Sequence, residues 1–216
     1  MKRILLTGFD PFGGEKINPS WEIAKSLDEI KIGKNAQIIS RQLPCEFGTS
    51  LQLLDAALRE LQPSIVICLG QAGGRAEMSL ERVAINIDDA RIPDNAGAQP
   101  IDNTIIPDAP AAYFSTLPIK AMMQSLQKQG IPAAISQTAG TYVCNHVFFG
   151  LMHMANIHSC IEKAGFVHIP YLPSQAIQFP QAPSMSFEMM KQGVECMIEM
   201  ALNRKGDVKL AAGASH

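Results

Sequence analysis

Two hydrophobic periodicities alternate along the chain. Apolar runs predict strands at 3–7, 36–43, 64–69, 132–136 and 165–169. Apolar residues spaced three and four apart predict helices at 21–27, 51–61, 117–129, 144–158 and 184–202, the first of them capped by Asn18 and Pro19. Strands that alternate with helices are typical of a parallel or mixed sheet covered by helices on both faces.

The middle of the chain is less regular. The segment 78–87 alternates apolar and polar residues and indicates a further strand, which could form one arm of a hairpin. From 88 to 110 the chain is rich in Pro, Asp and Asn, and so long a loop in a compact domain favours a functional cover over a simple connection. No repeat or linker divides the chain, so we expect a single domain over 1–205 and a disordered tail over 206–216.

Composition narrows the class of protein. With 216 residues, 47% of them hydrophobic and 18% charged, the chain can bury one sizeable core. A formal net charge of −2 gives no bulk attraction to nucleic acid or to an anionic membrane, so we expect neither as a partner. The N-terminal apolar run is interrupted by Gly8 and Asp10, and no apolar stretch approaches the roughly 18 residues of a membrane helix. These features predict a cytoplasmic protein.

The cysteines argue against structural cross-links. Five occur, at positions 45, 68, 144, 160 and 196, widely spaced and without a CxxC pair. This pattern indicates reduced thiols in a reducing compartment, not a disulfide framework or a zinc site, and we expect no bound metal. All except Cys144 lie within apolar runs or helices, where a free cysteine is usually a core residue.

Cys144 has a different setting, because it follows the strand 132–136 and a short turn and then begins a helix. The free backbone N–H groups and the positive dipole end of a helix start favour a thiolate over a thiol. A thiol placed there could attack a carbonyl group. By position alone, Cys144 is as consistent with a nucleophile as with a core residue.

A thiol nucleophile needs a base, and the chain has five histidines, at positions 146, 153, 158, 168 and 216. His146 lies two residues past Cys144, about 200° around the helix, and should point away. His168, at the tip of the strand 165–169, is the best placed. Cys144, His168 and the loops 8–14 and 70–75 all fall beyond the carboxyl ends of predicted strands, where open α/β sheets bind ligands.

The third member of such a site is a carboxylate or amide that orients the imidazole. Glu81 leads, because it is acidic within an otherwise apolar segment, and Asp88, Asp89 and Asp94 compete with it. A Glu81 that merely pairs with Arg75 or Arg82 is equally consistent with the pattern.

Four motifs resemble one known family, in that family's order and spacing. They are GFDPFGG with NPSW at 8–21, GQAGGR with SLERVAIN at 70–86, ISQTAGTYVCN at 135–145, and GFVHIPYLP at 165–173. Together they resemble the pyrrolidone-carboxylate peptidases, also called pyroglutamyl peptidase I. The resemblance extends from residue 3 to about 200.

The resemblance implies a cofactor-free intracellular cysteine exopeptidase that removes an N-terminal pyroglutamyl residue from peptides. It assigns Cys144 as nucleophile, His168 as base and Glu81 as the orienting acid. The oxyanion donors are the backbone N–H of Cys144 and, by resemblance, that of Arg91. The family's fold is a single-domain α/β/α sandwich with an open, twisted, mostly parallel sheet, usually assembled as a homotetramer.

The lactam of a pyroglutamyl residue is neutral, so its pocket needs flat apolar walls and one or two hydrogen bonds, not a counter-charge. The family resemblance favours Phe9 and Phe12 as walls, although core packing would equally explain both. Gln71 is the candidate polar contact. The further candidate lining residues are Ile92, Tyr142 and Val143, with Pro44 and Cys45 nearby.

Other classes lack their motifs. Neither glycine-rich loop contains GxGxxG or ends in GK[ST], as nucleotide-binding loops do. The chain has no GxSxG of a serine hydrolase and no HExxH of a metallopeptidase. The remaining rival is a non-catalytic α/β module whose loops bind a small molecule.

Overall fold

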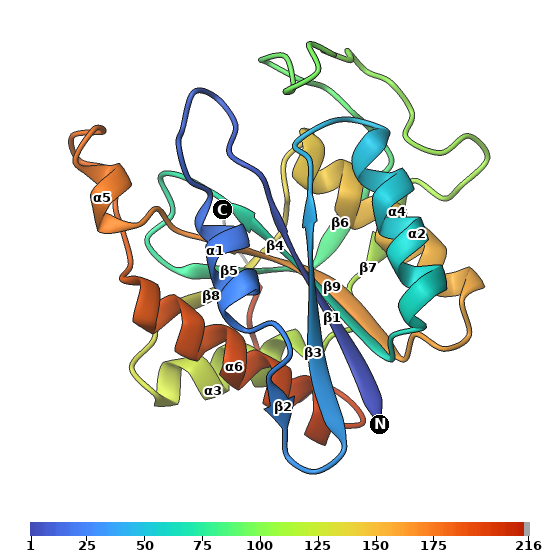
Figure 1. Ribbon diagram of the computed structural model, residues 1–216, viewed down its shortest axis with the longest axis vertical. Coiled ribbons are helices and arrows are strands. Elements are labelled where there is room, and N and C mark those ends of the chain that lie inside the picture. The colour runs from blue at the N-terminus through green and yellow to red at the C-terminus, as the bar shows by residue number, and fades with distance from the viewer. Residues whose placement is uncertain (214–216) are drawn as a thin grey trace.

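A seven-stranded mixed sheet forms the centre of the protein, whose computed structural model describes residues 1–213 (Figure 1). The strand order is β2-β3-β1-β4-β9-β5-β8. Neighbouring strands run parallel except β2 with β3 and β5 with β9. The strands are β1 (Lys2–Phe9), β2 (Lys31–Ile32), β3 (Ala36–Leu43), β4 (Ile65–Gln71), β5 (Met78–Glu81), β8 (Ala133–Ser136) and β9 (Lys163–Ile169).

Helices cover both faces of this sheet (Figure 1). One face packs against α1 (Pro19–Ser26), α3 (Ile119–Lys128) and α6 (Phe187–Asn203). The other packs against α2 (Thr49–Leu61) and α4 (Val143–Ile157). A short helix, α5 (Pro173–Ala176), follows β9. The three-layer α/β sandwich with a mostly parallel sheet is therefore confirmed.

Side-chain alternation explains the two cores. In β1, Ile4 and Leu6 join the cluster under α1 and α6, whereas Leu5 joins the cluster under α2 and α4. In β4, Ile67 joins the cluster under α1 and α6, and Val66 joins the cluster under α2 and α4. Successive side chains of a strand point to opposite faces, so a strand buried on both faces needs an unbroken apolar run. The sequence has such runs at β1 and β4.

The five predicted long helices are present, each with its ends within three residues of those expected. Asn18 caps α1 as expected, and its Oδ1 accepts a hydrogen bond from the Ser20 N–H at 3.1 Å. The strand predicted over 78–87 is present, but not as a single strand. It breaks at Arg82 into β5 and β6 (Val83–Ile85), and β6 pairs antiparallel with β7 (Ala112–Phe114) in a separate two-stranded sheet. The sequence pattern did not predict β2, β7 or α5, all of them short.

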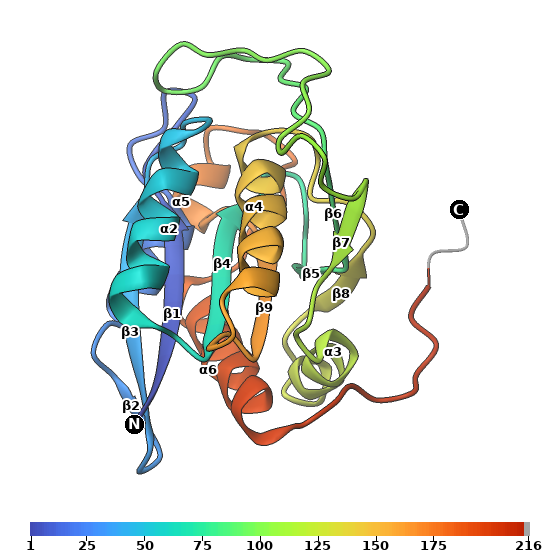
Figure 2. The same cartoon turned by 90° about the vertical axis from the view of Figure 1, so that its right-hand side faces the viewer.

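The long segment between β6 and β7 passes above the N-terminal ends of α2 and α4 (Figure 2). Asp94 anchors it, because one carboxylate oxygen accepts from the Phe47 N–H at 2.7 Å and the other from the N–H groups of Ala96 and Ala98. The Asn95 side chain donates to the Pro11 carbonyl at 2.9 Å. The segment is thus fixed to the loops that follow β1 and β3.

The described part of the C-terminal tail contacts the domain. The Asp207 carboxylate accepts from the backbone N–H groups of Lys120 and Ala121 at the start of α3, and Arg82 donates to the Ala212 carbonyl at 2.8 Å. The remainder of the tail predicted to be disordered, 214–216 with His216, lies outside the described residues. Within residues 1–213, no helix has the length and apolar character needed to cross a bilayer.

Candidate active site

β5 and β9 bring Glu81 and His168 together. Ser79 of β5 lies opposite His168 in the antiparallel pairing, so Glu81, two residues further, is diagonal to His168 on the same face of the sheet. The His168 Nδ1 and Glu81 Oε1 are 2.7 Å apart, and both side chains are buried. A carboxylate accepts at Nδ1, so the imidazole carries its proton there and keeps Nε2 as the free basic nitrogen.

Arg75 completes this pair. Its Nη1 lies 2.6 Å from Glu81 Oε1, and its Nη2 donates to the Thr138 carbonyl at 3.0 Å. The guanidinium compensates a carboxylate that has no solvent exposure. The sequence left two alternatives for Glu81, a pair with a histidine or a pair with Arg75. In the structure Glu81 contacts both. The second oxygen, Glu81 Oε2, has no hydrogen-bond donor among residues 1–213.

Cys144 is the second residue of α4, and its thiol lies against the end of β4. A Cβ atom on Gly70 would be 2.9 Å from the Cys144 sulfur and 2.7 Å from the Phe166 ring. Gly70 is paired with His168, and the rings of Phe166 and His168 are 4.9 Å apart. The thiol and the imidazole therefore share one face of the sheet, and the thiol approaches it closely because residue 70 lacks a side chain.

Burial raises the pKa of the Cys144 thiol well above its usual range, and the charges of Cys45 and Glu81 act in the same direction. The charge of Arg75 and the start of α4 oppose this shift. The helix start that the sequence predicts therefore acts on the Cys144 pKa in the direction opposite to burial. A nucleophilic sulfur requires a base that accepts the thiol proton, and His168 Nε2 is a basic nitrogen on this face with no hydrogen-bond partner among residues 1–213.

Backbone donors occur at the start of α4 and in the segment between β6 and β7. The first hydrogen bond of α4 runs from the His146 N–H to the Tyr142 carbonyl at 3.1 Å. Within residues 1–213, the N–H groups of Cys144 and Arg91 have no hydrogen-bond acceptor. Free N–H groups at a helix start are suitable donors to a developing oxyanion. A cavity of about 440 Å³ lies between the segment after β6 and the turn before α4, lined by Asp89, Arg91, Ile92, Gly140, Thr141 and Tyr142.

The predicted pocket residues divide into two groups. On the open side, Phe12 packs on Tyr142 with ring centroids 6.2 Å apart, and Ile92 is 47% exposed. Phe9 and Val143 are buried in the core behind them, where Phe9 packs on Phe166. The structure therefore brings Phe12, Ile92 and Tyr142 to the surface of the site and leaves Phe9 and Val143 as its support.

Gln71 ends β4 and is buried, and its Oε1 accepts a hydrogen bond from Gln175 Nε2 at 2.9 Å. Cys45 is buried beside Tyr142. Burial raises the pKa of Cys45 to about 12, and a hydrogen bond with Tyr142 opposes the shift.

The other candidate acids and bases have their own partners. His146 Nδ1 lies 2.8 Å from Asp88 Oδ2, and His146 Nε2 accepts from the Gly48 N–H at 3.0 Å. These contacts agree with the prediction that His146 points away from Cys144. Asp89 is exposed, and Asp94 anchors the covering loop.

His153 and His158 lie late in α4 and at its end. His153 lies 3.0 Å from the Tyr113 hydroxyl, and His158 lies 3.6 Å from Asp55. Within the described part of the chain, no cluster of three or more His, Cys, Asp or Glu side chains could hold a metal ion.

Sequence reasoning missed two residues of the site. Phe47 packs edge-on against Tyr142 with ring centroids 5.4 Å apart, and nothing in its local sequence pattern indicated this. Asn145 is fully buried and forms hydrogen bonds with the backbone of Ile85 and Ile87. A polar residue at the start of an apolar helix was the available signal for Asn145.

A thiol at a helix start, beside an imidazole held by a buried carboxylate, defines the class of α/β cysteine hydrolases. The sequence model of the pyroglutamyl peptidase family matches residues 2–204. The chain belongs to this family.

Similar proteins cover nearly the whole chain. It is 54% identical to a pyrrolidone-carboxylate peptidase of Yersinia pestis over 216 residues, which is 100% of both chains. The crystal structure of pyroglutamyl peptidase I from Bacillus amyloliquefaciens is 48% identical, covers 97% of this chain and 99% of its own, and superposes with a TM-score of 0.94. A mutant pyrrolidone carboxyl peptidase from Pyrococcus furiosus is also 48% identical, with coverages of 94% and 99% and a TM-score of 0.92.

Proposed function

We propose that this protein is a cysteine peptidase that hydrolyses the amide bond after an N-terminal pyroglutamyl residue, with Cys144 as its nucleophile. The observation that carries the proposal is the His168–Glu81 pair on the face of the sheet where the Cys144 thiol lies, against Gly70. The proteins that resemble this chain over its full length carry the names pyrrolidone-carboxylate peptidase and pyroglutamyl peptidase I.

Acylation begins when the Cys144 thiol passes its proton to His168 Nε2 and the sulfur attacks the pyroglutamyl carbonyl carbon. The carbonyl oxygen becomes an oxyanion that accepts from the backbone N–H groups of Cys144 and Arg91. The carbon–nitrogen bond then breaks, and His168 gives its proton to the leaving amine. The product of this half-reaction is a pyroglutamyl thioester on Cys144.

Deacylation uses the same groups with water. His168 Nε2 removes a proton from the water molecule whose oxygen attacks the thioester carbon, and the carbon–sulfur bond breaks. The sulfur then recovers the proton from His168 and pyroglutamate leaves. Glu81 holds the ring with Nδ1 protonated and stabilises the imidazolium, and Arg75 fixes Glu81.

Phe9, Phe12, Ile92, Tyr142 and Val143 form the apolar surroundings of the lactam in this proposal. All five are uncharged, which suits a substrate whose amino end is neutral.

The amide of Gln71 has a defined orientation. Gln175 Oε1 accepts from the Leu172 N–H at 3.0 Å, so Gln175 Nε2 must face Gln71 Oε1. Gln71 therefore keeps its Nε2 as the free end, a donor suited to the lactam carbonyl.

The proposal extends to a cytoplasmic homotetramer that works without a metal or organic cofactor and binds neither nucleic acid nor membrane. Sedimentation at several protein concentrations tests the assembly, and a single monomeric species would contradict it. Exhaustive dialysis against a chelator tests whether a metal is needed, and we expect full activity to remain.

Release of a reporter amine from a pyroglutamyl amide tests the activity. We expect turnover by the freshly reduced wild type and by Cys160→Ser, and none by Cys144→Ser. Cys160 is a matched control because it is also a partly exposed free cysteine. A folded wild type that binds pyroglutamyl amide without cleaving it would indicate the rival binding module, and an active Cys144→Ser would remove Cys144 from the mechanism.

A further inference from the structure

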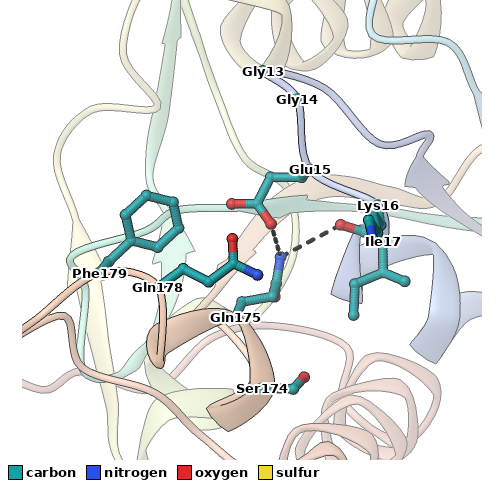
Figure 3. Close-up of a pocket in the computed structure, with 9 residues that line it drawn as sticks. All are labelled: Gly13, Gly14, Glu15, Lys16, Ile17, Ser174, Gln175, Gln178 and Phe179. Carbon is teal, nitrogen blue, oxygen red and sulfur yellow. Dashed lines mark hydrogen bonds between the residues drawn. The ribbon is translucent and has the colours of Figure 1, made fainter.

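A second cavity lies between the loop after β1 and the segment after β9. It has a volume of about 380 Å³, within the range of about 300–1,000 Å³ usual for small-ligand sites. The loop after β1, residues 13–17, forms one wall, and the segment from Ser174 to Phe179 forms the other (Figure 3). Neither wall contains a residue that the mechanism uses.

The cavity is joined to the catalytic strands by a buried amide. Figure 3 shows Gln175 on the cavity floor, where its Nε2 donates to Glu15 at 3.1 Å and to the Ile17 carbonyl at 3.4 Å. The same nitrogen donates to Gln71, the neighbour of the Gly70 that contacts the Cys144 thiol. One buried side chain thus ties both cavity walls to the end of β4.

A second connection runs through Tyr171. Its ring stacks on Phe179 at the cavity wall, with centroids 5.2 Å apart and an interplanar angle of 9°. The other side of Tyr171 contacts Gly73, in the loop after β4. Burial raises the pKa of Tyr171, and the negative charge of Glu15 adds to this, so Tyr171 also lies near the opposite wall. Tyr171 follows His168 by three residues along the chain.

From these contacts we infer that this cavity is a subsite for the peptide that follows the pyroglutamyl residue. The inference rests on the proposed function, because His168 protonates the leaving amine and the departing peptide must lie on the His168 side. Gly13 and Gly14 leave open space on their wall, so a peptide backbone can approach closely. Glu15 and Lys16 give this wall one negative and one positive charge. The cavity therefore favours contacts with the peptide backbone and has no preference for a substrate side chain of one charge.

Two substrates and three variants test the subsite. One substrate is the pyroglutamyl amide of a single-ring aromatic amine, and the other is a pyroglutamyl tetrapeptide. Gln178→Ala and Phe179→Ala remove exposed side chains from the cavity wall. Ile177→Ala is the matched control, because Ile177 is 82% exposed in the same segment and does not line the cavity.

For the tetrapeptide, we expect each wall variant to lower kcat/KM about tenfold, mainly through KM, as loss of one side-chain contact does. For the small amide, we expect kcat/KM to stay within about twofold of the wild type. Ile177→Ala should leave both substrates unchanged. Equal losses for both substrates, or no loss for the tetrapeptide, would overturn the subsite. A wild type that cleaves neither substrate would instead refute the proposed function.

Discussion

Two buried carboxylate–histidine pairs lie within residues 1–213, and they differ in what the histidine Nε2 contacts. Glu81 holds His168 Nδ1 at 2.7 Å, and Asp88 holds His146 Nδ1 at 2.8 Å. In each pair, one carboxylate oxygen has no hydrogen-bond partner within residues 1–213. His146 Nε2, however, accepts from the Gly48 N–H, whereas His168 Nε2 has no such partner in the described chain.

That difference separates a structural histidine from a candidate base. His146 has both nitrogens occupied and is fixed as a neutral ring that joins α4 to the loops around Gly48 and Asp88. His168 has an oriented ring with a free basic nitrogen on the face of the Cys144 thiol. Burial and a carboxylate partner are common to both pairs, so neither feature alone identifies a catalytic imidazole.

The largest expected effect comes from His168→Ala. Without an acceptor for the thiol proton, and with the pKa of Cys144 raised by burial, we expect kcat to fall by about 10⁴-fold or more. Steady-state hydrolysis of a pyroglutamyl amide measures this, and circular dichroism verifies that the variant is folded. A folded variant with near-normal kcat would assign the base elsewhere.

His146→Ala is the matched test of the other pair. It leaves the buried Asp88 carboxylate and the partly buried Gly48 N–H without their partner, so we expect a loss of about 2–4 kcal/mol in the free energy of unfolding. We expect kcat of the folded fraction to change by less than about threefold. Urea unfolding with parallel kinetics measures both, and a deep loss of kcat at unchanged stability would erase the distinction between the pairs.

Glu81→Gln should have a smaller effect than His168→Ala, about 10²-fold in kcat, because the amide still contacts the ring but cannot stabilise the imidazolium. Asp88→Asn is its counterpart and should leave kcat nearly unchanged while lowering Tm. The two substitutions, compared in one assay, measure how specific the carboxylate requirement is. Equal effects on kcat would mean that the two carboxylates are not functionally different.

Gly70→Ala probes the approach of Cys144 to the strands. The added methyl group would meet the Phe166 ring at 2.7 Å and the Cys144 sulfur at 2.9 Å, so the thiol must shift. We expect kcat to fall about 10- to 100-fold, as a displacement near 1 Å does. Gly206→Ala is the control, because a Cβ there meets nothing within 4 Å. Unchanged kcat in Gly70→Ala would show that the thiol position is not critical.

The pH dependence of thiol reactivity tests the role of His168 without any substrate. Wild-type Cys144 should react with iodoacetamide near neutral pH because His168 accepts its proton. In His168→Ala no base accepts the thiol proton, so the raised pKa of Cys144 should determine how much thiolate forms. The alkylation rate should then drop at least about tenfold at pH 7 and rise steadily beyond pH 9. Cys45 and Cys68, whose pKa values burial raises to about 12, are internal controls. Identical pH profiles in the two proteins would contradict a role for His168.

The sequence predicted the parts of the site that depend on local pattern. Cys144 begins a helix after a strand and turn, and His168 lies near the end of a strand, so topology alone placed them at one edge of the sheet. Family resemblance was needed to prefer Glu81. Glu81 lies next to His168 because β5 pairs antiparallel with β9. Hydrophobic periodicity predicts which segments are strands, but it does not predict which strands are neighbours in the sheet.

The contacts that fix the site depend on long-range packing. Arg75 contacts both Glu81 and the Thr138 carbonyl, which lie in distant parts of the sequence, so the sequence pattern does not distinguish this contact from the alternatives. The contact between Asp88 and His146 is also long-range, so the sequence pattern did not predict it. The pattern offered each residue only as a separate candidate for the catalytic acid or base.

Mass spectrometry of the enzyme, acid-quenched during turnover of a pyroglutamyl amide, tests the central claim most directly. The account predicts a pyroglutamyl adduct on the peptide that contains Cys144, with the other four cysteines unmodified. It predicts no adduct in Cys144→Ala and slower formation in His168→Ala than in His146→Ala. An adduct on another cysteine, or turnover by Cys144→Ala, would contradict it.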